Sequence, residues 1–192
     1  MSLLIPQHRE SRFTAPSVWA PRPDLYGAFG TDAAEEEVCE LLASLVRAIK
    51  PCFVLETGTH EGRSAVYIAD ALRRNKYGRM VSLEINADYA RTARSRVEDV
   101  LRGYSYLWQV EEISSFDYIP PQPIDFLFSD SELGTRQQGL ERMRPFLAPR
   151  AWVAVHDSLT HRSVMGDLTS VGWIERVDIP TPRGLTIGRI TA

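Results

Sequence analysis

Residues 53–68 read Phe53-Val54-Leu55-Glu56-Thr57-Gly58-Thr59-His60-Glu61-Gly62-Arg63-Ser64-Ala65-Val66-Tyr67-Ile68, and the rest of the chain is interpreted outward from them. The first three residues form a short apolar run, which is typical of a strand buried on both faces. Gly58 and Gly62 flank a tight turn, and apolar residues then recur at helical spacing. A strand, a glycine turn and a helix in this order place a nucleotide-like ligand at the carboxyl edge of an open α/β sheet.

Glu56 distinguishes this turn from the Gly-x-Gly-x-x-Gly turn of dinucleotide-binding folds. The spacing here is Glu-x-Gly-x-x-x-Gly, and an acid before the first glycine would repel a pyrophosphate. It favours a ligand with a cationic end. Gly58 can take backbone angles closed to other residues, so it lets a ligand approach the backbone. The N–H groups of the following helix then face that ligand. A βα turn without any ligand is the alternative interpretation.

The turn resembles the first motif of class I S-adenosylmethionine-dependent methyltransferases, and most closely that of catechol-type and related small-molecule O-methyltransferases. The resemblance continues through the second motif, Met80-Val81-Ser82-Leu83-Glu84-Ile85-Asn86. It implies that S-adenosylmethionine is the cofactor and that the two oxygens of Glu84 accept the ribose hydroxyls. It also places the loop over residues 111–116 beside the adenine. The cofactor-binding residues that it implies are Glu56, Gly58, Thr59, Gly62, Ser64, Glu84, Ile85, Ser114 and Asp130.

The composition predicts one soluble globular chain in the cytoplasm. Its 192 residues are 44% hydrophobic and 24% charged, which suffices for a sizeable core. A net charge of −3 gives no basic excess for a phosphate backbone, which argues against a nucleic-acid partner. No stretch approaches the roughly 20 apolar residues of a membrane helix, so no membrane partner is expected. The two cysteines, Cys39 and Cys52, lack metal-ligand spacing and indicate reduced thiols.

The chain divides into residues 1–30, an irregular arm or lid, and residues 31–192, a single methyltransferase domain. Prolines and aromatic residues alternate in the first region, and proline blocks regular helices and central strands. We expect this arm to pack on the domain or on the second subunit of a homodimer. A lid over the substrate is the alternative interpretation.

Helical and strand-like segments alternate along the domain, which predicts an α/β fold. We expect a Rossmann-like seven-stranded sheet, parallel with an antiparallel last strand and with helices on both faces. The expected strands are 53–56, 80–85, 105–110, 124–129, 151–156, 173–178 and 185–190. The first expected helix starts at Thr31 or Asp32 and is ended by Pro51. A later helix is capped by Asn86 or Asp88 and runs to about Leu101. The other expected helices cover 63–75, 135–146 and 163–170. Glu35, Glu36 and Glu37 are expected to form a solvated first turn of the first helix.

Acidic and imidazole side chains follow the fourth and fifth expected strands. They are Asp130, Glu132, His156, Asp157 and His161. A hydroxyl acceptor has to lose its proton to a base or to a metal that lowers its pKa. Asp130 and Asp157 form a candidate Mg²⁺ site, because two neighbouring carboxylates repel unless a cation or proton intervenes. His156 is the alternative base, since its ordinary pKa lies near neutral pH. The catalytic candidates are therefore Asp130, His156 and Asp157.

Two positions depart from the enzymes that this chain resembles. Metal-dependent members carry an asparagine after the second aspartate, and the catechol enzyme carries a lysine about three residues after the first. This chain has Ser158 and Leu133 there. We therefore keep three functions open: a methyltransferase acting on a small-molecule hydroxyl, which we favour, a dinucleotide-dependent oxidoreductase, and a non-catalytic S-adenosylmethionine-binding module.

Overall fold

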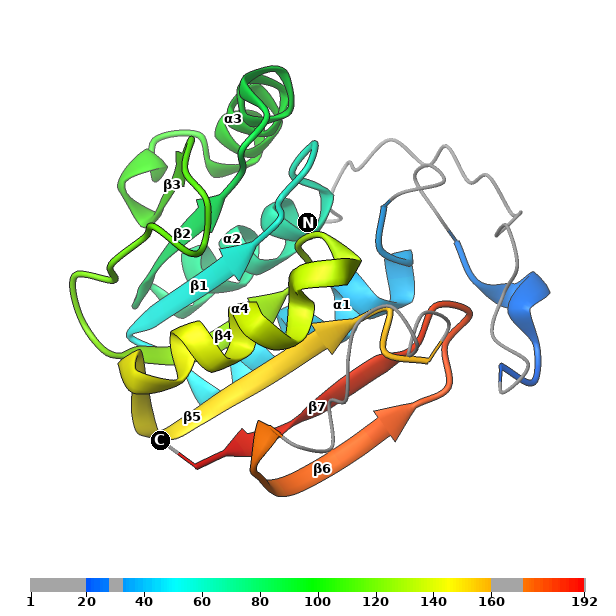
Figure 1. Cartoon of the computed structure of the whole chain (residues 1–192). Helices are drawn as coiled ribbons and strands as arrows, with labels where there is room; N and C mark the ends of the chain where they lie inside the picture. The colour runs from blue at the N-terminus through cyan, green and yellow to red at the C-terminus, as the bar shows by residue number, and fades with distance from the viewer. Residues whose placement is uncertain (1–19, 28–32, 160–170, 192) are drawn as a thin grey trace.

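The computed structural model describes residues 20–27, 33–159 and 171–191. Within them a seven-stranded sheet has the order β3-β2-β1-β4-β5-β7-β6 (Figure 1). The strands are β1 (Phe53–Thr57), β2 (Arg79–Leu83), β3 (Trp108–Glu111), β4 (Ile124–Ser129), β5 (Leu147–His156), β6 (Trp173–Ile179) and β7 (Leu185–Ile190). Only β7 runs antiparallel to its neighbours, so the predicted sheet is confirmed.

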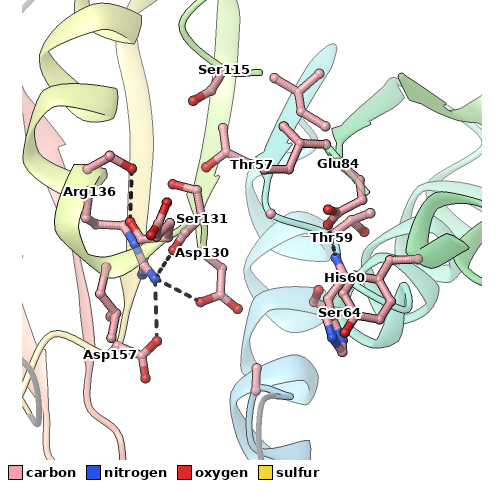
Figure 2. A pocket seen from close by; sticks show the side chains of 18 of the residues that line it. Thr57, Thr59, His60, Ser64, Glu84, Ser115, Asp130, Ser131, Arg136 and Asp157 are labelled. Carbon is pink, nitrogen blue, oxygen red and sulfur yellow. Dashed lines mark hydrogen bonds and ion pairs between the residues drawn. The ribbon is translucent and has the colours of Figure 1, made fainter. Parts of the chain in front are cut away.

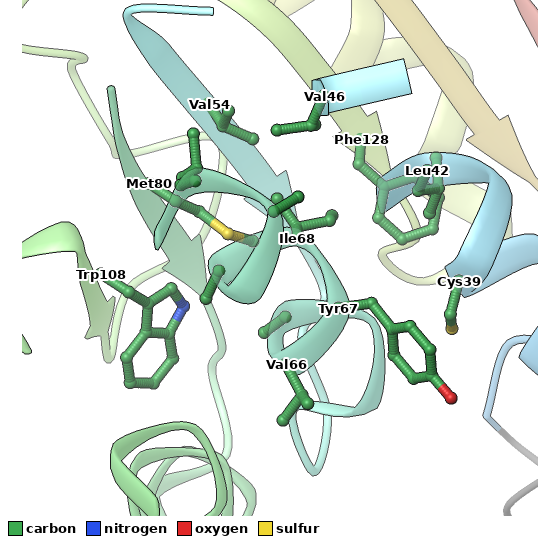
Figure 3. Close-up of a cluster of buried hydrophobic side chains, with 14 of the residues drawn as sticks. Cys39, Leu42, Val46, Val54, Val66, Tyr67, Ile68, Met80, Trp108 and Phe128 are labelled. Carbon is green, nitrogen blue, oxygen red and sulfur yellow. The ribbon is translucent and has the colours of Figure 1, made fainter. Parts of the chain in front are cut away.

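Helices cover both faces of this sheet, as the sequence predicted. One face carries α1 (Glu36–Ile49), α2 (Arg63–Asn75) and α3 (Ala87–Leu101), and the other carries α4 (Arg136–Met143) (Figure 1). Successive strand residues point to opposite faces, and β1 divides its side chains accordingly. Val54 packs with Leu42 and Ile68 under α1 and α2 (Figure 3). Phe53 and Leu55 join the cluster of α4 on the other face. Apolar burial on both faces therefore fixes β1 in the centre, with its carboxyl end free for a site.

Element boundaries differ from the sequence expectations at several places. β2 ends at Leu83 and not at residue 85. β5 begins at Leu147 and not at residue 151, and its pairing with β4 is irregular where Pro149 lies, because proline cannot donate to the ladder. Ser105–Leu107 is a 3₁₀ turn that precedes β3. α4 is shorter than expected and lies between the 3₁₀ turns Leu133–Thr135 and Arg144–Phe146. The carboxyl ends of β4 and β5 lie where they were expected.

Some predictions fall where the structure gives no description. The helix expected over 163–170, His161 and the caps Thr31 and Asp32 lie outside the described residues. Of the predicted arm, residues 20–27 are described, and they contain the 3₁₀ turn Pro23–Leu25. No helix in the described part of the chain is both long and apolar enough to cross a membrane.

The expectation that Glu35 to Glu37 form a solvated helix start is wrong. α1 begins at Glu36, and Glu35 and Glu36 are only 0% and 8% exposed. Buried carboxylates need partners. Glu35 has them on β5 and on the turn between β6 and β7, far along the chain. Glu36 accepts a hydrogen bond from the Tyr67 hydroxyl at 3.3 Å. The acidic run is thus part of the interior and not a solvated face.

Candidate active site

A cavity of about 900 Å³ opens at the carboxyl ends of β1, β2 and β4. Figure 2 shows its two walls. Thr59, His60 and Glu84 stand on one wall, where β1 turns into α2 and β2 ends. Asp130 and Arg136 stand on the other, where β4 ends and α4 begins. The carboxyl edge of the sheet is where the glycine turn predicted a ligand site.

The two glycines of the β1–α2 turn both require the absence of a side chain. Gly58 has φ +78°, and a Cβ there would lie 2.4 Å from the carbonyl oxygen of Asp130. Gly62 has φ +78°, and its Cβ would lie 2.8 Å from the Cα of Ala93 in α3. Glycine populates such backbone angles without penalty. Gly58 therefore brings the ends of β1 and β4 together, and Gly62 lets α2 pack against α3.

Glu56 lies beneath the turn and is fully buried. Its carboxylate accepts hydrogen bonds from the hydroxyls of Thr59 at 2.6 Å, Ser64 at 2.5 Å and Ser82 at 2.6 Å. Burial raises the pKa of Glu56, and the three hydroxyl bonds partly offset this rise. Thr59 and Ser64 line the cavity, whereas within the described chain Glu56 is not part of its wall. Glu56 thus holds the cavity-lining hydroxyls in place, which differs from the expected direct meeting with a cationic ligand end.

Glu84 lies just beyond β2 with its carboxylate fixed by backbone groups. One oxygen accepts a hydrogen bond from the backbone N–H of His60 at 2.8 Å, and the other accepts one from the backbone N–H of Asn86 at 2.9 Å. The Asn86 side chain in turn caps α3, which makes it the cap of the two that the sequence offered. Each carboxylate oxygen can accept more than one hydrogen bond. Because Glu84 lines the cavity, its oxygens are held ready for a pair of hydroxyl donors.

The far end of the cavity is lined by residues that follow β2 and β3. Ile85 is 75% exposed and lies on the wall, together with Ile113, Ser114, Ser115 and Phe116. The Ser114 hydroxyl accepts the N–H of Phe116 at 3.2 Å, which tightens this loop. Apolar side chains with a few polar groups are the usual lining for a flat ring. The structure therefore brings the predicted second-motif residue and the predicted adenine loop to one end of one cavity.

The ends of β4 and β5 bring Asp130 and Asp157 together around His156. Nδ1 of His156 lies 3.0 Å from Oδ1 of Asp130 and 3.6 Å from Oδ2 of Asp157. Nε2 of His156 lies 2.6 Å from Oε2 of Glu35, at the start of α1. The histidine is fully buried. Three carboxylates therefore surround one imidazole.

Two arginines that the sequence reasoning missed complete this cluster. Arg183, in the turn between β6 and β7, contacts Asp157 through Nε at 2.5 Å and Nη2 at 3.0 Å. Arg136, at the start of α4, is 1% exposed, and its Nη2 lies 3.4 Å from Asp130 and 3.5 Å from Asp157 (Figure 2). We call the six residues Glu35, Asp130, Arg136, His156, Asp157 and Arg183 the ion cluster. It has three acidic and three basic members.

The charged members of the ion cluster shift one another's pKa values. Burial alone would lower the pKa of His156, but Asp130, Asp157 and Glu35 outweigh it and raise that pKa to about 10. Burial would raise the pKa of Asp157, but His156 and Arg183 hold it below its ordinary value. Burial would likewise raise the pKa of Glu35, but His156 holds it below its ordinary value. These contacts favour the protonated imidazole, which is a poorer proton acceptor, and the role of His156 as a base stays a prediction.

The ion cluster also tests the predicted Mg²⁺ site. Asp130, His156 and Asp157 offer ligand atoms within 4.8 Å of one another. Both oxygens of Asp157 already contact Arg183, however, and the imidazolium occupies Oδ1 of Asp130. The repulsion between the two carboxylates is thus relieved by protein cations, and the donor set does not fit a divalent ion.

Asp130 is the member of the ion cluster that still faces the cavity with a free acceptor. It is 13% exposed, and in the described part of the chain its bonds to His156 and Arg136 both use Oδ1. Oδ2 is left to accept a hydrogen bond from a bound molecule. Asp157 differs from Asp130, because it is 2% exposed and both of its oxygens already contact Arg183.

Comparison with known proteins gives a family and a fold. A family model described as "Methyltransferase domain" matches residues 55–158, just over half of the chain. No curated protein matches the chain by sequence.

Several solved structures share the fold at low identity. The O-methyltransferase TomG from Streptomyces achromogenes, solved with SAM, is 21% identical over 84% of this chain and 83% of its own, with a TM-score of 0.68. The SAH-bound methyltransferase PaMTH1 from Podospora anserina is 15% identical over 90% and 82%, with a TM-score of 0.70. An O-methyltransferase from Bacillus cereus, solved with SAH, is 16% identical over 84% of each chain, with a TM-score of 0.68.

Proposed function

This chain belongs to the Methyltransferase domain family, and from this premise we propose that it transfers the methyl group of S-adenosylmethionine to a hydroxyl oxygen of a small molecule. The observation that carries the proposal is that two carboxylates stand on the two opposite walls of one cavity. Glu84, held by two backbone N–H groups, stands on one wall, and Asp130, with a free oxygen, stands on the other. The first suits a ribose and the second suits an acceptor hydroxyl.

The cofactor is proposed to lie along the carboxyl edge of the sheet. Its ribose hydroxyls donate to Glu84, and its adenine packs against Ile85 and the loop that contains Ser114. Its methionine end lies over the β1–α2 turn, where the hydroxyls of Thr59 and Ser64 line the cavity. The N–H groups at the start of α2 point toward the cavity edge and favour the carboxylate of that end. The methyl group then points toward the wall formed by β4.

The reaction needs only a weak base in this arrangement. The acceptor oxygen attacks the methyl carbon in line, the O–C bond forms, and the S–C bond breaks with its electron pair going to sulfur. The hydroxyl proton becomes strongly acidic as the new bond forms, so a carboxylate can accept it. Oδ2 of Asp130 is the proposed acceptor of that proton, which then passes to water. The chain contributes position and proton acceptance, because the sulfonium is already activated.

The test combines binding and turnover. We expect calorimetry to show micromolar-order binding of the demethylated cofactor, S-adenosylhomocysteine, and a panel of small-molecule hydroxyl acceptors to identify turnover. Asp130→Asn should keep that binding within about threefold and lower methyl transfer by at least about 100-fold, the usual range for a lost proton acceptor. Asp99→Asn, an exposed aspartate of α3, is the matched control. Binding of NAD without S-adenosylhomocysteine would refute the function, and cofactor binding without any turnover would favour a non-catalytic module.

The location of the enzyme, the class of its acceptor and the role of its amino-terminal arm stay predictions from the sequence. We propose the cytoplasm as its location and a small molecule as its acceptor, because a net charge of −3 provides no basic excess for nucleic acid. The arm over residues 1–30 remains a predicted contact with the domain or with the second subunit of a homodimer, or a predicted lid.

A further inference from the structure

The ion cluster lies where a pair of carboxylates at adjacent strand ends would otherwise hold a divalent metal. Asp157 uses both of its oxygens for the fork of Arg183, at 2.5 Å and 3.0 Å. A two-point guanidinium–carboxylate contact is among the strongest ion pairs that side chains form. A metal could bind Asp157 only by displacing that fork.

The two arginines are also fixed by further hydrogen bonds, so they cannot easily move aside. Arg183 donates through Nη1 to the carbonyl of Ala33 at 3.1 Å, and its backbone N–H donates to Glu35 at 2.8 Å. Arg136 donates through Nη1 to the carbonyl oxygens of Ser129 at 3.0 Å and of His156 at 2.5 Å. The acceptors lie just before α1 and on β4 and β5. Each arginine is therefore part of the framework.

The carboxylates at this site already have cationic partners. Among the described residues, the charged groups that face His156 are Glu35 just before α1, and Asp130 and Asp157 from the ends of β4 and β5, with the two arginines behind them. Arg136 lies against Asp130 and Asp157, and Arg183 pairs with Asp157. A dication would have to share these buried carboxylates with two guanidinium groups that already contact them, which is unfavourable.

Resting on the proposed function, we propose that His156, Arg136 and Arg183 replace a divalent metal, so that this enzyme works without one and accepts molecules with a single hydroxyl. A bound metal selects acceptors with two adjacent oxygens, because both can coordinate it. Here the acceptor finds one fixed partner, Oδ2 of Asp130. The three cations are positioning residues, since they hold Asp130 and Asp157 and do not touch the acceptor themselves.

The first experiment uses the wild-type chain. Titration with Mn²⁺, followed by electron paramagnetic resonance, should show no stoichiometric binding below about 1 mM. Methyl transfer should change less than twofold after treatment with EDTA. An acceptor carrying one hydroxyl should react within about threefold of its counterpart with a second, adjacent hydroxyl. Stoichiometric Mn²⁺ binding together with loss of activity on chelation would overturn the inference.

A second experiment tests the role of Arg183. Arg183→Gln should slow turnover at least tenfold while the affinity for S-adenosylhomocysteine changes less than threefold, and Arg183→Lys should recover part of the rate. Arg176→Gln is the matched control, because Arg176 pairs with Asp178 at 2.9 Å on the surface of the same hairpin. An unchanged rate in Arg183→Gln would refute the positioning role. If that variant does not fold, the wild-type titration still decides between a metal and the cluster.

The two proposals fail in different ways. If the wild-type chain binds no S-adenosylhomocysteine, the proposed function is wrong. If it binds the cofactor and transfers methyl groups only with an added metal, the function stands and this inference is wrong.

Discussion

Replacing Glu35 by glutamine should destabilise the protein strongly, although the two side chains have nearly the same shape. The carboxylate is fully buried. It forms a hydrogen bond with Nε2 of His156 at 2.6 Å and accepts another from the backbone N–H of Arg183 at 2.8 Å. Removing one partner of a buried ion pair costs about 3–5 kcal/mol when the other charge is left alone. His156 keeps Asp130 at 3.0 Å as a second partner, so we expect a cost below that range, of about 2–3 kcal/mol. For a chain of this size that lowers the Tm by about 4–12 °C.

The assay is thermal unfolding of wild type and Glu35→Gln at pH 7, with Glu40→Gln as control. Glu40 is exposed on the same helix, and its replacement should leave the Tm within about 2 °C. The pH dependence then separates charge from shape. The folded pKa of His156, about 10, lies above its ordinary 6.5. Its contribution is therefore complete below pH 6.5 and is lost as the pH rises through 10. The difference between the two proteins should shrink over that window.

Two results would contradict this reasoning. If Glu35→Gln unfolds at the same temperature as Glu40→Gln, Glu35 carries no buried charge pair. If the destabilisation is the same at pH 7 and above pH 10, it comes from packing and not from the charge of His156.

The other predictions concern the wall of the cavity at which the cofactor is proposed to bind. Glu84→Ala should weaken S-adenosylhomocysteine binding by about 1–3 kcal/mol, or roughly 5- to 150-fold in Kd, because the ribose hydroxyls lose their acceptor; calorimetry showing parental affinity would mean that Glu84 does not hold the ribose. Gly58→Ala should disrupt the site, since its Cβ would meet the Asp130 backbone at 2.4 Å. Gly103→Ala is the control, with φ +88° but nothing within 4 Å of its Cβ; it should cost only the left-handed backbone term of about 1–2 kcal/mol. Equal loss of thermal stability in the two glycine variants would show that the close approach at Gly58 does not matter.

Local patterns in the sequence were sufficient to predict the fold and to locate one wall of the cavity. Apolar runs gave the strands, helical spacing gave the helices, and the last hairpin gave the antiparallel edge. The glycine spacing located the turn at Gly58 and Gly62, and the acid that follows the second strand located Glu84. These features depend on neighbours within a few residues, and short-range chemistry therefore determines them. Helix and strand ends were less certain, because 3₁₀ turns and the irregular pairing near Pro149 depend on packing.

The catalytic end of the cavity could be decided only by the tertiary structure. From the sequence, Glu35 is a solvated helix residue, His156 a base, and Asp130 with Asp157 a metal site. In the fold, Glu35 and His156 meet although 121 positions separate them, and Arg183 reaches Glu35 across 148 positions. Burial then makes each charge depend on its partners, since an unpaired buried charge is too costly to keep. No local pattern records which distant side chains supply those partners, and the direction in which the pKa of His156 moves depends on them.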